Sequence, residues 1–198
     1  RLLLEDPDGI SRPAFCSGNT NLLATVTDDS RIKVWDLAAR RVQMEFEGHP
    51  RSINAIAFSR DGKWLASTSA DKSVKLWEVE SKNREPVRTL HRYSYPALGV
   101  AFSPDGRHLF SGGSEAMIRT WNVATGMEEG APLEGHAGWI YALAVAPDGL
   151  RLASGGSDGT VIVWDVISRQ REMKFLGHGA QVVSLAFSPD QRTLAAGG

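Results

Sequence analysis

The chain has 198 residues, of which 42% are hydrophobic, and a formal net charge of −1 at pH 7. This near-neutral balance argues against binding of nucleic acid or an anionic membrane through a charged surface, while the apolar content is ample for burial. No apolar stretch approaches the length of a transmembrane helix. The single Cys16 allows no internal disulfide, which fits a reducing compartment, so a cytoplasmic protein is expected.

Tryptophan recurs along the chain at a nearly constant spacing. Trp35, Trp77, Trp121 and Trp164 are separated by 42, 44 and 43 residues, and each is followed by Asp, Glu or Asn. A histidine stands 28 residues before the second and the fourth of these tryptophans, and a tyrosine stands 28 residues before the third. This period is typical of propeller blades that contain four strands each.

Each copy reads as a series of short strands. Stretches rich in Val, Ile, Leu and aromatic residues are separated by clusters of Gly, Pro, Asn and Asp, and no helix-period stretch competes with them. Strands are expected over 53–58, 64–68 and 74–78 in the second copy, and over 140–145, 152–155 and 161–165 in the fourth. The segments 59–62, 104–106 and 147–149 are expected to be hairpin turns rather than ligand loops, because their Gly tolerates a positive φ and Pro, where present, presets the backbone.

The order of these features is repeated as well as their spacing. In the second and fourth copies a Gly-His pair, with His49 or His136, precedes the first strand. An aspartate, Asp71 or Asp158, precedes the strand that contains the tryptophan. This pattern resembles the WD40 repeat family over essentially the whole chain. The resemblance implies an all-β, WD40-type β-propeller made of four-stranded antiparallel blades. The repeats are expected at about 1–37, 43–79, 87–123, 130–166 and, in part, 172–198.

The copies at the two ends are expected to be incomplete. Residues 1–4 align with 43–46, the outer strand that precedes a Gly-His, and residues 182–187 and 193–197 supply two inner strands of a fifth copy. About four and a half repeats suggest a segment of a longer propeller, truncated at both ends. The missing blades of the same parent chain are then expected partners, because open strand edges offer unpaired backbone groups.

His, Ser and Asp at matching positions supply the residue types of a hydrolase triad. A catalytic constellation is normally built once, whereas this set occurs twice, so a structural role is favoured. The resemblance to WD40 proteins implies buried hydrogen-bonded tetrads: His49, Ser67, Asp71 and Trp77, then His136, Ser154, Asp158 and Trp164. No catalytic residue, cofactor site or metal site is expected; the segment 6–9, Asp-Pro-Asp-Gly, begins like a calcium loop but lacks the remaining ligands.

Two copies depart from this pattern. Pro7 takes the His place in the first copy, and Tyr93 and Glu115 take the His and Asp places in the third. Neither blade is expected to hold the full network, although Glu115 is long enough to reach a backbone amide. Cys16 takes the place that Phe58 has in the second copy, so a buried core thiol is expected there.

The resemblance also implies where partners bind. WD40 partners commonly contact the residues three and five after the Gly-His histidine and the residue before the turn Asp, here Ile10, Arg12, Asp28, Ser52, Asn54, Ala70, Pro96, Leu98, Ser114, Trp139, Tyr141, Ser157, Gln181 and Val183. Trp139 and Tyr141 flank the core position Ile140, so strand alternation directs both toward the rim or the central channel. Such aromatic side chains are natural interface anchors. Arg12, Asn54 and Gln181 are expected to provide polar contacts at the edge of this binding surface.

The resemblance favours a non-catalytic protein–protein interaction scaffold whose top rim binds a peptide or a partner domain. The alternative is a docking or sensor domain of a larger signalling enzyme, a kinase or NTPase fusion with catalysis outside this segment. A catalytic propeller has no support, because no unrepeated cluster of His, Cys, Asp or Glu occurs. The expected partner is a protein or peptide, with no nucleic acid, no membrane and no cofactor.

Overall fold

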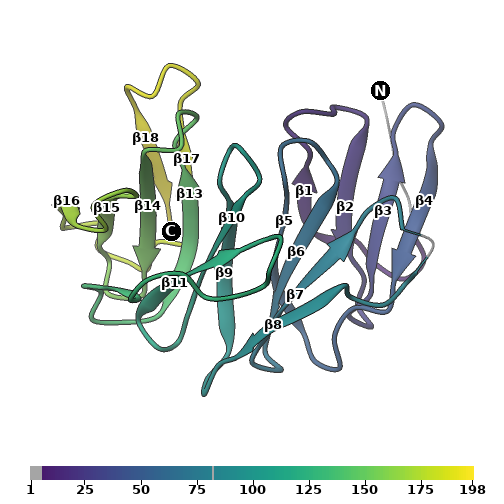
Figure 1. The fold of residues 1–198 in the computed structure, drawn as a ribbon, viewed down its shortest axis with the longest axis horizontal. Coiled ribbons are helices and arrows are strands. Elements are labelled where there is room, and N and C mark those ends of the chain that lie inside the picture. Colours follow the sequence, from purple (N-terminus) through teal and green to yellow (C-terminus); the bar gives the residue numbers. More distant parts are fainter. Residues whose placement is uncertain (1–5, 82) are drawn as a thin grey trace.

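The computed structural model describes residues 6–81 and 83–198 (Figure 1). Within these residues the chain forms eighteen strands and no helix, which confirms the all-β class. The strands are β1 (Ser11–Phe15), β2 (Leu22–Val26), β3 (Ile32–Asp36), β4 (Arg41–Phe46), β5 (Ile53–Phe58), β6 (Trp64–Ser69), β7 (Ser73–Glu78), β8 (Arg88–Arg92), β9 (Ala97–Phe102), β10 (His108–Gly113), β11 (Met117–Asn122), β12 (Leu133–Glu134), β13 (Ile140–Val145), β14 (Arg151–Gly156), β15 (Val161–Asp165), β16 (Arg171–Phe175), β17 (Ser184–Phe187) and β18 (Leu194–Gly197). The outer strand expected over residues 1–4 lies outside the described residues.

The strands form four sheets of four strands and one sheet of two. In each larger sheet the strands are hydrogen-bonded in chain order, β1 to β4, β5 to β8, β9 to β12 and β13 to β16, and every neighbouring pair is antiparallel. Strands β17 and β18 form the remaining sheet. The first strands of successive sheets lie next to one another, so the sheets fan out side by side from a row of inner strands (Figure 1). Four-stranded antiparallel blades, as the sequence predicts, are therefore confirmed.

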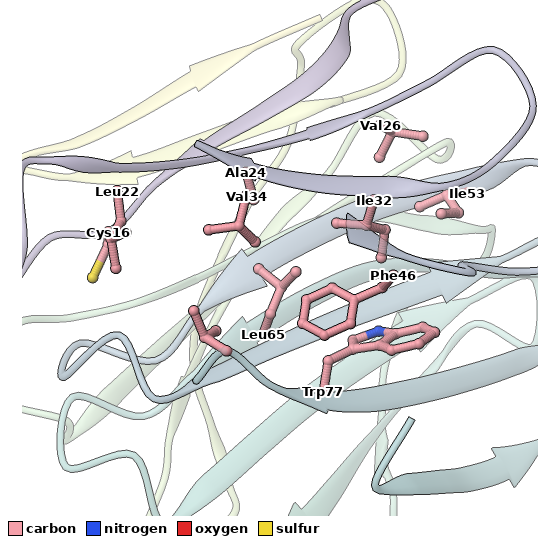
Figure 2. Close-up of a cluster of buried hydrophobic side chains, with 11 residues drawn as sticks. Cys16, Leu22, Ala24, Val26, Ile32, Val34, Phe46, Ile53, Leu65 and Trp77 are labelled. Carbon is pink, nitrogen blue, oxygen red and sulfur yellow. The ribbon is translucent and has the colours of Figure 1, made fainter. Parts of the chain in front are cut away.

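Successive residues of a strand pack against different neighbouring sheets. Leu65 in β6 and Trp77 in β7 face the first sheet, where the indole of Trp77 lies 5.2 Å from the ring of Phe46, centroid to centroid (Figure 2). The adjacent residues Ala66 and Leu76 belong instead to the core between the second and third sheets. This follows from the period of two in a strand, which sends successive side chains to opposite faces. A blade is therefore buried on both faces, and each interface depends on the sheet before or after it.

The expected hairpin turns are confirmed. Gly62, Gly106 and Gly149 have φ values of 74°, 70° and 78°, in the left-handed region that glycine enters at no steric cost. Each glycine N–H donates to the carbonyl three residues earlier, at 3.0, 2.9 and 2.8 Å respectively. The chain reverses here between the first and second strands of a blade.

In the first sheet, residues before the second strand do not align with the other repeats as counting from the tryptophan predicts. Ser11 pairs with Val26 and Ala14 pairs with Ala24, so β1 holds one more residue than β2 between these two pairs. This bulge contains Arg12, whose φ is 49°. A bulge bends the strand and shifts all residues before it relative to the other repeats.

The hairpin that follows β1 is also one residue longer than its counterpart. The N–H of Cys16 donates to the carbonyl of Leu22, whereas the N–H of Ser59 donates to the carbonyl of Trp64. Cys16 therefore takes the place of Ser59 and not that of Phe58, and the alignment given above is wrong by one residue there. The expected burial of the thiol is confirmed, since Cys16 is 1% exposed.

These two insertions move the rim positions of the first repeat. A backbone hydrogen bond of 2.9 Å joins the rim to the turn before the third strand, from Asp28 to Asp8 in the first repeat and from Ala70 to Ser52 in the second. The rim residues of the first repeat are therefore Asp8 and Ile10, and the assignment of Arg12 to a rim position is wrong. Pro7 is likewise not at the histidine position, which falls on residue 5, outside the described residues.

Candidate functional site

His49 lies at the centre of a buried polar cluster in the second repeat. Its Nδ1 is 2.8 Å from Oδ2 of Asp71, and its Nε2 is 2.6 Å from Oγ of Ser67. The indole N–H of Trp77 donates to the same Ser67 oxygen at 2.9 Å. The hydroxyl of Ser73 adds a hydrogen bond of 2.6 Å to Oδ1 of Asp71. The structure thus brings together the four side chains of the first expected tetrad.

The arrangement fits a neutral imidazole. When Nδ1–H of His49 donates to Asp71, Nε2 is left to accept from the Ser67 hydroxyl, whose oxygen in turn accepts the indole proton. Burial lowers the pKa of His49, and the hydrogen bond to Asp71 only partly opposes this. Burial opposes ionisation of Asp71, yet hydrogen bonds from Ser73 and His49 hold its pKa below the ordinary 3.8. Every polar atom in this chain of bonds has a partner, as buried polar groups require.

The fourth repeat contains the same cluster around His136. Its Nε2 is 2.7 Å from Oγ of Ser154, to which the indole of Trp164 donates at 2.8 Å, and its Nδ1 is 3.1 Å from Oδ2 of Asp158. Asp158 also accepts the backbone N–H of Ala137 at 2.8 Å. Despite partial burial, that hydrogen bond and those from neighbouring side chains lower the pKa of Asp158 to about 2. The carboxylate thereby ties the loop before β13 to the turn before β15.

The third repeat holds a modified cluster. The hydroxyl of Tyr93 is 2.6 Å from Oγ of Ser111, and the indole of Trp121 donates to that oxygen at 2.7 Å. Oε1 of Glu115 accepts the backbone N–H of Ser94 at 2.7 Å, which confirms that the longer side chain reaches an amide. The phenol thus takes over the contact with Ser111 that an imidazole makes with its serine in the second and fourth repeats.

An arginine completes the cluster of the third repeat. Arg119 forms ion pairs with Glu115 at 3.3 Å and with Glu128 at 2.8 Å. Its guanidinium carbon lies 5.5 Å from the ring centroid of Tyr93, a cation–π distance. Burial raises the pKa of Tyr93 above its ordinary value. In this repeat a phenol therefore stands where the second and fourth repeats have a titratable imidazole, and Arg119 stands where the second repeat has Lys75.

The first repeat also uses a cation. The indole of Trp35 donates to Oγ1 of Thr25 at 2.8 Å, the same bond that Trp77 makes to Ser67. Lys33, which is 7% exposed, binds Asp6 at 2.8 Å and Asp8 at 2.7 Å. Asp6 and Asp8 are the carboxylates of the segment that begins like a calcium loop, and here they hold an ammonium group. Within residues 6–81 and 83–198, no group of three or more His, Cys, Asp or Glu side chains is arranged to hold a metal ion.

The tetrads are built for internal cohesion. The hydroxyls of Ser67 and Ser154, which would be the nucleophiles of a triad, belong to residues that are 0% exposed. A nucleophile must approach its substrate closely, and these oxygens are already occupied by an imidazole and an indole. Since the arrangement recurs in the second and fourth repeats, its role is structural: the hydrogen bonds hold loops to strands.

A groove of about 580 Å³ lies where the second, third and fourth repeats meet at the rim. It is lined by Asn54, Ala70, Tyr95, Pro96, Leu98, Ser114 and Trp139, and we call it the aromatic groove. None of these side chains is charged. Tyr95 and Trp139 are 59% and 51% exposed, which is unusual for large aromatic side chains. All lining residues except Tyr95 occupy positions that the resemblance assigns to partner contacts.

Local contacts fix the backbone of Trp139 while leaving its indole open. The N–H of Trp139 donates to Oγ of Ser157 at 2.8 Å, and its carbonyl accepts the N–H of Ser157, also at 2.8 Å. Gly138 permits this approach, because a Cβ at that position would collide with Oγ of Ser157. The ring of Tyr141 meets the indole edge-on, at 6.3 Å between centroids and 73° between planes. The indole is therefore presented to solvent from a fixed base.

The residues predicted to bind a partner have different positions around this groove. Trp139 and Asn54 line it, and Tyr141 supports Trp139 from the side. Arg12 is not among the lining residues, and its guanidinium donates to the backbone carbonyl of Asn54 at 2.7 Å. Gln181 is exposed but does not line the groove. Partner binding by these residues stays a prediction.

Sequence reasoning missed Tyr95. This residue lies between Ser94 and Pro96, at none of the positions that follow from the WD40 pattern. A large aromatic residue in a short polar segment before a strand was the available signal. Its 59% exposure makes it the most open aromatic side chain of the groove.

No helix long and apolar enough to cross a membrane occurs in the part of the chain that the structure describes.

The family model described as WD domain, G-beta repeat, matches residues 8–36, 40–78, 84–122, 128–165 and 169–198. WD repeat-containing protein 36 of Homo sapiens is 40% identical over 63 residues, which cover 32% of this chain and 7% of that protein. Nuclear distribution protein PAC1 of Arthroderma benhamiae is 32% identical over 76 residues, 38% of this chain and 16% of that protein. Pre-mRNA-processing factor 17 of Saccharomyces cerevisiae is 33% identical over 93 residues, 46% of this chain and 20% of that protein. The chain thus matches a fifth or less of the length of each of these relatives.

Proposed function

Since the chain belongs to the WD40 family, we propose that it is a non-catalytic interaction scaffold whose aromatic groove docks a protein or peptide partner. The observation that carries this proposal is the convergence of rim positions from three consecutive repeats on one uncharged hollow with two exposed aromatic rings. Trp and Tyr are enriched among the residues that dominate binding energy at interfaces. Trp139 and Tyr95 are the proposed anchors.

The rigidity of the rim supports a docking role. The segments that carry Trp139, Pro96 and Ser52 are each held to the following turn by a backbone hydrogen bond of 2.8, 3.1 or 2.9 Å. A surface that is ordered before binding loses little conformational entropy when a partner arrives. The groove therefore suits repeated docking of a flexible partner better than chemistry on a small molecule.

Charge supports a protein partner over nucleic acid. The formal net charge is −1, and the groove lining has no Lys or Arg side chain to neutralise phosphates. Nucleic-acid affinity depends largely on such contacts. A cytoplasmic location remains part of the proposal, on the ground of the single buried thiol.

A quantitative capture experiment tests the proposal. Partners are recovered from one lysate with the wild-type protein, with a Trp139→Ala/Tyr141→Ala double variant and with Ile167→Ala. Ile167 is the control, because it is an apolar side chain that is 77% exposed in the turn after β15 and lies outside the groove. Melting temperatures of all three proteins are measured first, to show that each is folded.

The expected result is that recovery of a specific partner falls at least about tenfold in the double variant and is unchanged in the control, in line with the loss of an interface anchor. Equal recovery with all three proteins would contradict the proposal. In that case the aromatics pack only against each other, and the working surface lies elsewhere.

A further inference from the structure

The exposed indole of the groove and the buried imidazole of the fourth tetrad belong to one short segment, residues 136–139, which we call the rim segment. Ser157 holds Trp139 through both its backbone N–H and its carbonyl, each at 2.8 Å. Gly156 lies beneath the rim segment. A Cβ on Gly156 would lie 2.8 Å from Nδ1 of His136 and 3.1 Å from the carbonyl oxygen of Trp139. The imidazole and the backbone of the groove anchor are therefore packed against the same point.

The carboxylate of Asp158 fastens the start of the rim segment. Its Oδ2 accepts the N–H of Ala137 at 2.8 Å and lies 3.1 Å from Nδ1 of His136. Asp158 directly follows Ser157, which holds the other end of the segment. One turn thus secures the whole rim segment, and displacement of the imidazole would loosen the backbone that presents Trp139.

The site around His136 is built for a neutral ring. Its Nε2 lies 2.7 Å from Oγ of Ser154, and the indole N–H of Trp164 donates to that same oxygen at 2.8 Å. A protonated ring would also donate from Nε2, so the hydroxyl would have to turn to the carbonyl of Ile162 at 3.4 Å. That distance is long for an O–H···O hydrogen bond. The side chain of His136 is 0% exposed, so water cannot hydrate the added charge while the segment is closed.

Two charged groups of opposite sign act on this ring. The carboxylate of Asp158 favours a proton on His136, whereas the ammonium group of Lys174 on β16 opposes it. Burial is the largest influence and lowers the pKa of His136, which Asp158 only partly offsets. When the rim segment opens, the ring reaches water and its pKa returns toward the ordinary value of about 6.5. The open segment therefore binds a proton more readily than the closed one.

The opposite wall of the groove is fastened without an imidazole. The N–H of Ser94, the residue before Tyr95, donates to Glu115 at 2.7 Å, and Glu115 is paired with Arg119 at 3.3 Å. The phenol of Tyr93 stands in the place of the histidine, and burial raises its pKa. Neither the phenol nor the guanidinium changes its charge between pH 8 and pH 5. Acid therefore acts on the wall that carries Trp139 and spares the wall that carries Tyr95.

We propose that protonation of His136 opens the rim segment and withdraws Trp139 from the aromatic groove while Tyr95 stays in place, an acid-sensitive switch that rests on the proposed docking function. Proton uptake by the open form shifts the local equilibrium between closed and open segments. Between pH 7.5 and pH 5 the opening constant rises by up to about 30-fold, the limit set by a freed imidazole that titrates near 6.5. A partner anchored on Trp139 is released over the same range.

Amide hydrogen exchange followed by NMR tests the switch in the protein without any partner. Exchange is recorded between pH 7.5 and pH 5, and each rate is divided by the intrinsic rate at that pH to give a protection factor. The protection factors of Ala137 and Trp139 are expected to fall at least about fivefold, within the limit of about 30-fold. That of Ser94, the matched amide of the third repeat, is expected to change less than about twofold. Constant protection at Trp139, or an equal fall at Ser94, would overturn the inference.

A substitution assigns the effect to one ring. His136→Gln removes the titrating group and leaves His49 of the second repeat in place. The protection of Trp139 in this variant is expected to be lower than in the wild type at pH 7.5 and to be independent of pH. A pH dependence that persists in His136→Gln would overturn the assignment to His136. If this variant does not fold, the contrast between Trp139 and Ser94 in the wild type decides.

The switch and the proposed function fail in different ways. If partner capture is lost in the Trp139→Ala/Tyr141→Ala variant but the protection of Trp139 does not change with pH, the docking function stands and the switch is wrong. If the protection of Trp139 falls with pH as expected but capture does not depend on Trp139, the local opening stands and the proposed function fails.

Discussion

Replacing Ser67 by alanine removes the hydroxyl that joins Trp77 to His49. The indole N–H and Nε2 of the imidazole lose their partner at 2.9 and 2.6 Å, and neither can turn to water, because Trp77 and the side chain of His49 are both 0% exposed. Each stranded buried group costs about 1–3 kcal/mol. We therefore expect Ser67→Ala to lower the free energy of unfolding by about 2–6 kcal/mol, since two such groups are left.

The assay is urea unfolding followed by tryptophan fluorescence, with calorimetry as a second measure. For a protein of this length, a loss of about 3 kcal/mol corresponds to a fall in Tm of roughly 6–12 °C. Ser154→Ala in the fourth repeat removes the same two hydrogen bonds and is expected to behave alike. The control is Ser52→Ala, an exposed serine whose effect is expected to stay within about 0.5 kcal/mol.

The result that would refute this reasoning is specific. If Ser67→Ala unfolds at the same urea concentration as Ser52→Ala, the tetrad contributes no cohesion, and the buried hydrogen bonds are incidental to stability. If Ser67→Ala is destabilised but Ser154→Ala is not, the two clusters are not equivalent devices. Either outcome would reopen the question of what the His, Ser and Asp side chains do.

Three further predictions concern the same clusters and the first sheet. Asp158→Ala is expected to cost about 2–4 kcal/mol, because the N–H of Ala137 and Nδ1 of His136 lose their acceptor; equilibrium unfolding measures it, and an unchanged stability would contradict the role of the carboxylate. Stability is expected to fall as the pH drops below about 6.5, because the pKa of both tetrad histidines is lower in the folded chain than in the unfolded chain, which therefore takes up more protons. A second loss of stability is expected below pH 3.8. There the carboxylate of Asp158 protonates in the unfolded chain, whereas its pKa in the folded chain is about 2. Unfolding curves between pH 8 and pH 3 test this, and a rise in stability from pH 8 to pH 5 would show the sign to be wrong. Cys16→Ser is expected to change the free energy of unfolding by less than about 1 kcal/mol, because Cys16 occupies the position that Ser59 has in the second repeat. Cys16→Phe is expected to cost about 1–3 kcal/mol, because it overpacks a site that is 1% exposed. If thermal melts showed Cys16→Phe to be the more stable variant, the alignment of Cys16 with Phe58 would be restored.

Much of the fold could be predicted because local chemistry repeats. The strands over 53–58 and 140–145 coincide with β5 and β13, since alternating apolar residues and Pro-Asp-Gly or Asp-Gly turns mark their ends. The tetrad residues could be grouped because their spacing is nearly the same in two repeats. Sequence spacing, however, assumes a constant number of residues per strand and turn.

That assumption fails in the first repeat. The bulge at Arg12 and the longer hairpin after Cys16 each add a residue, and together they displaced the expected histidine position to Pro7. Residue counting back from Trp35 cannot detect either insertion, because it assumes that every repeat has the same strand and turn lengths. The bulge becomes visible only in the pairing of β1 with β2.

The aromatic groove could be predicted only in part, for a related reason. Position rules identified Trp139 and Asn54, because both stand at fixed distances from the Gly-His motif. Tyr95 lies outside those rules, and its approach to Trp139 depends on how the third and fourth sheets pack. The ion pair of Arg119 with Glu128 likewise depends on a cross-strand arrangement that no single motif records.

The most direct test of the docking account is site-specific photo-crosslinking in cells. A photoreactive amino acid is placed at Ser114, which lines the aromatic groove, and separately at Met127, which is 71% exposed and outside it. The account predicts a discrete crosslinked adduct from position 114 that disappears when Trp139→Ala is added, and none from position 127. Equal adducts from both positions, or an adduct at 114 that persists in Trp139→Ala, would contradict it.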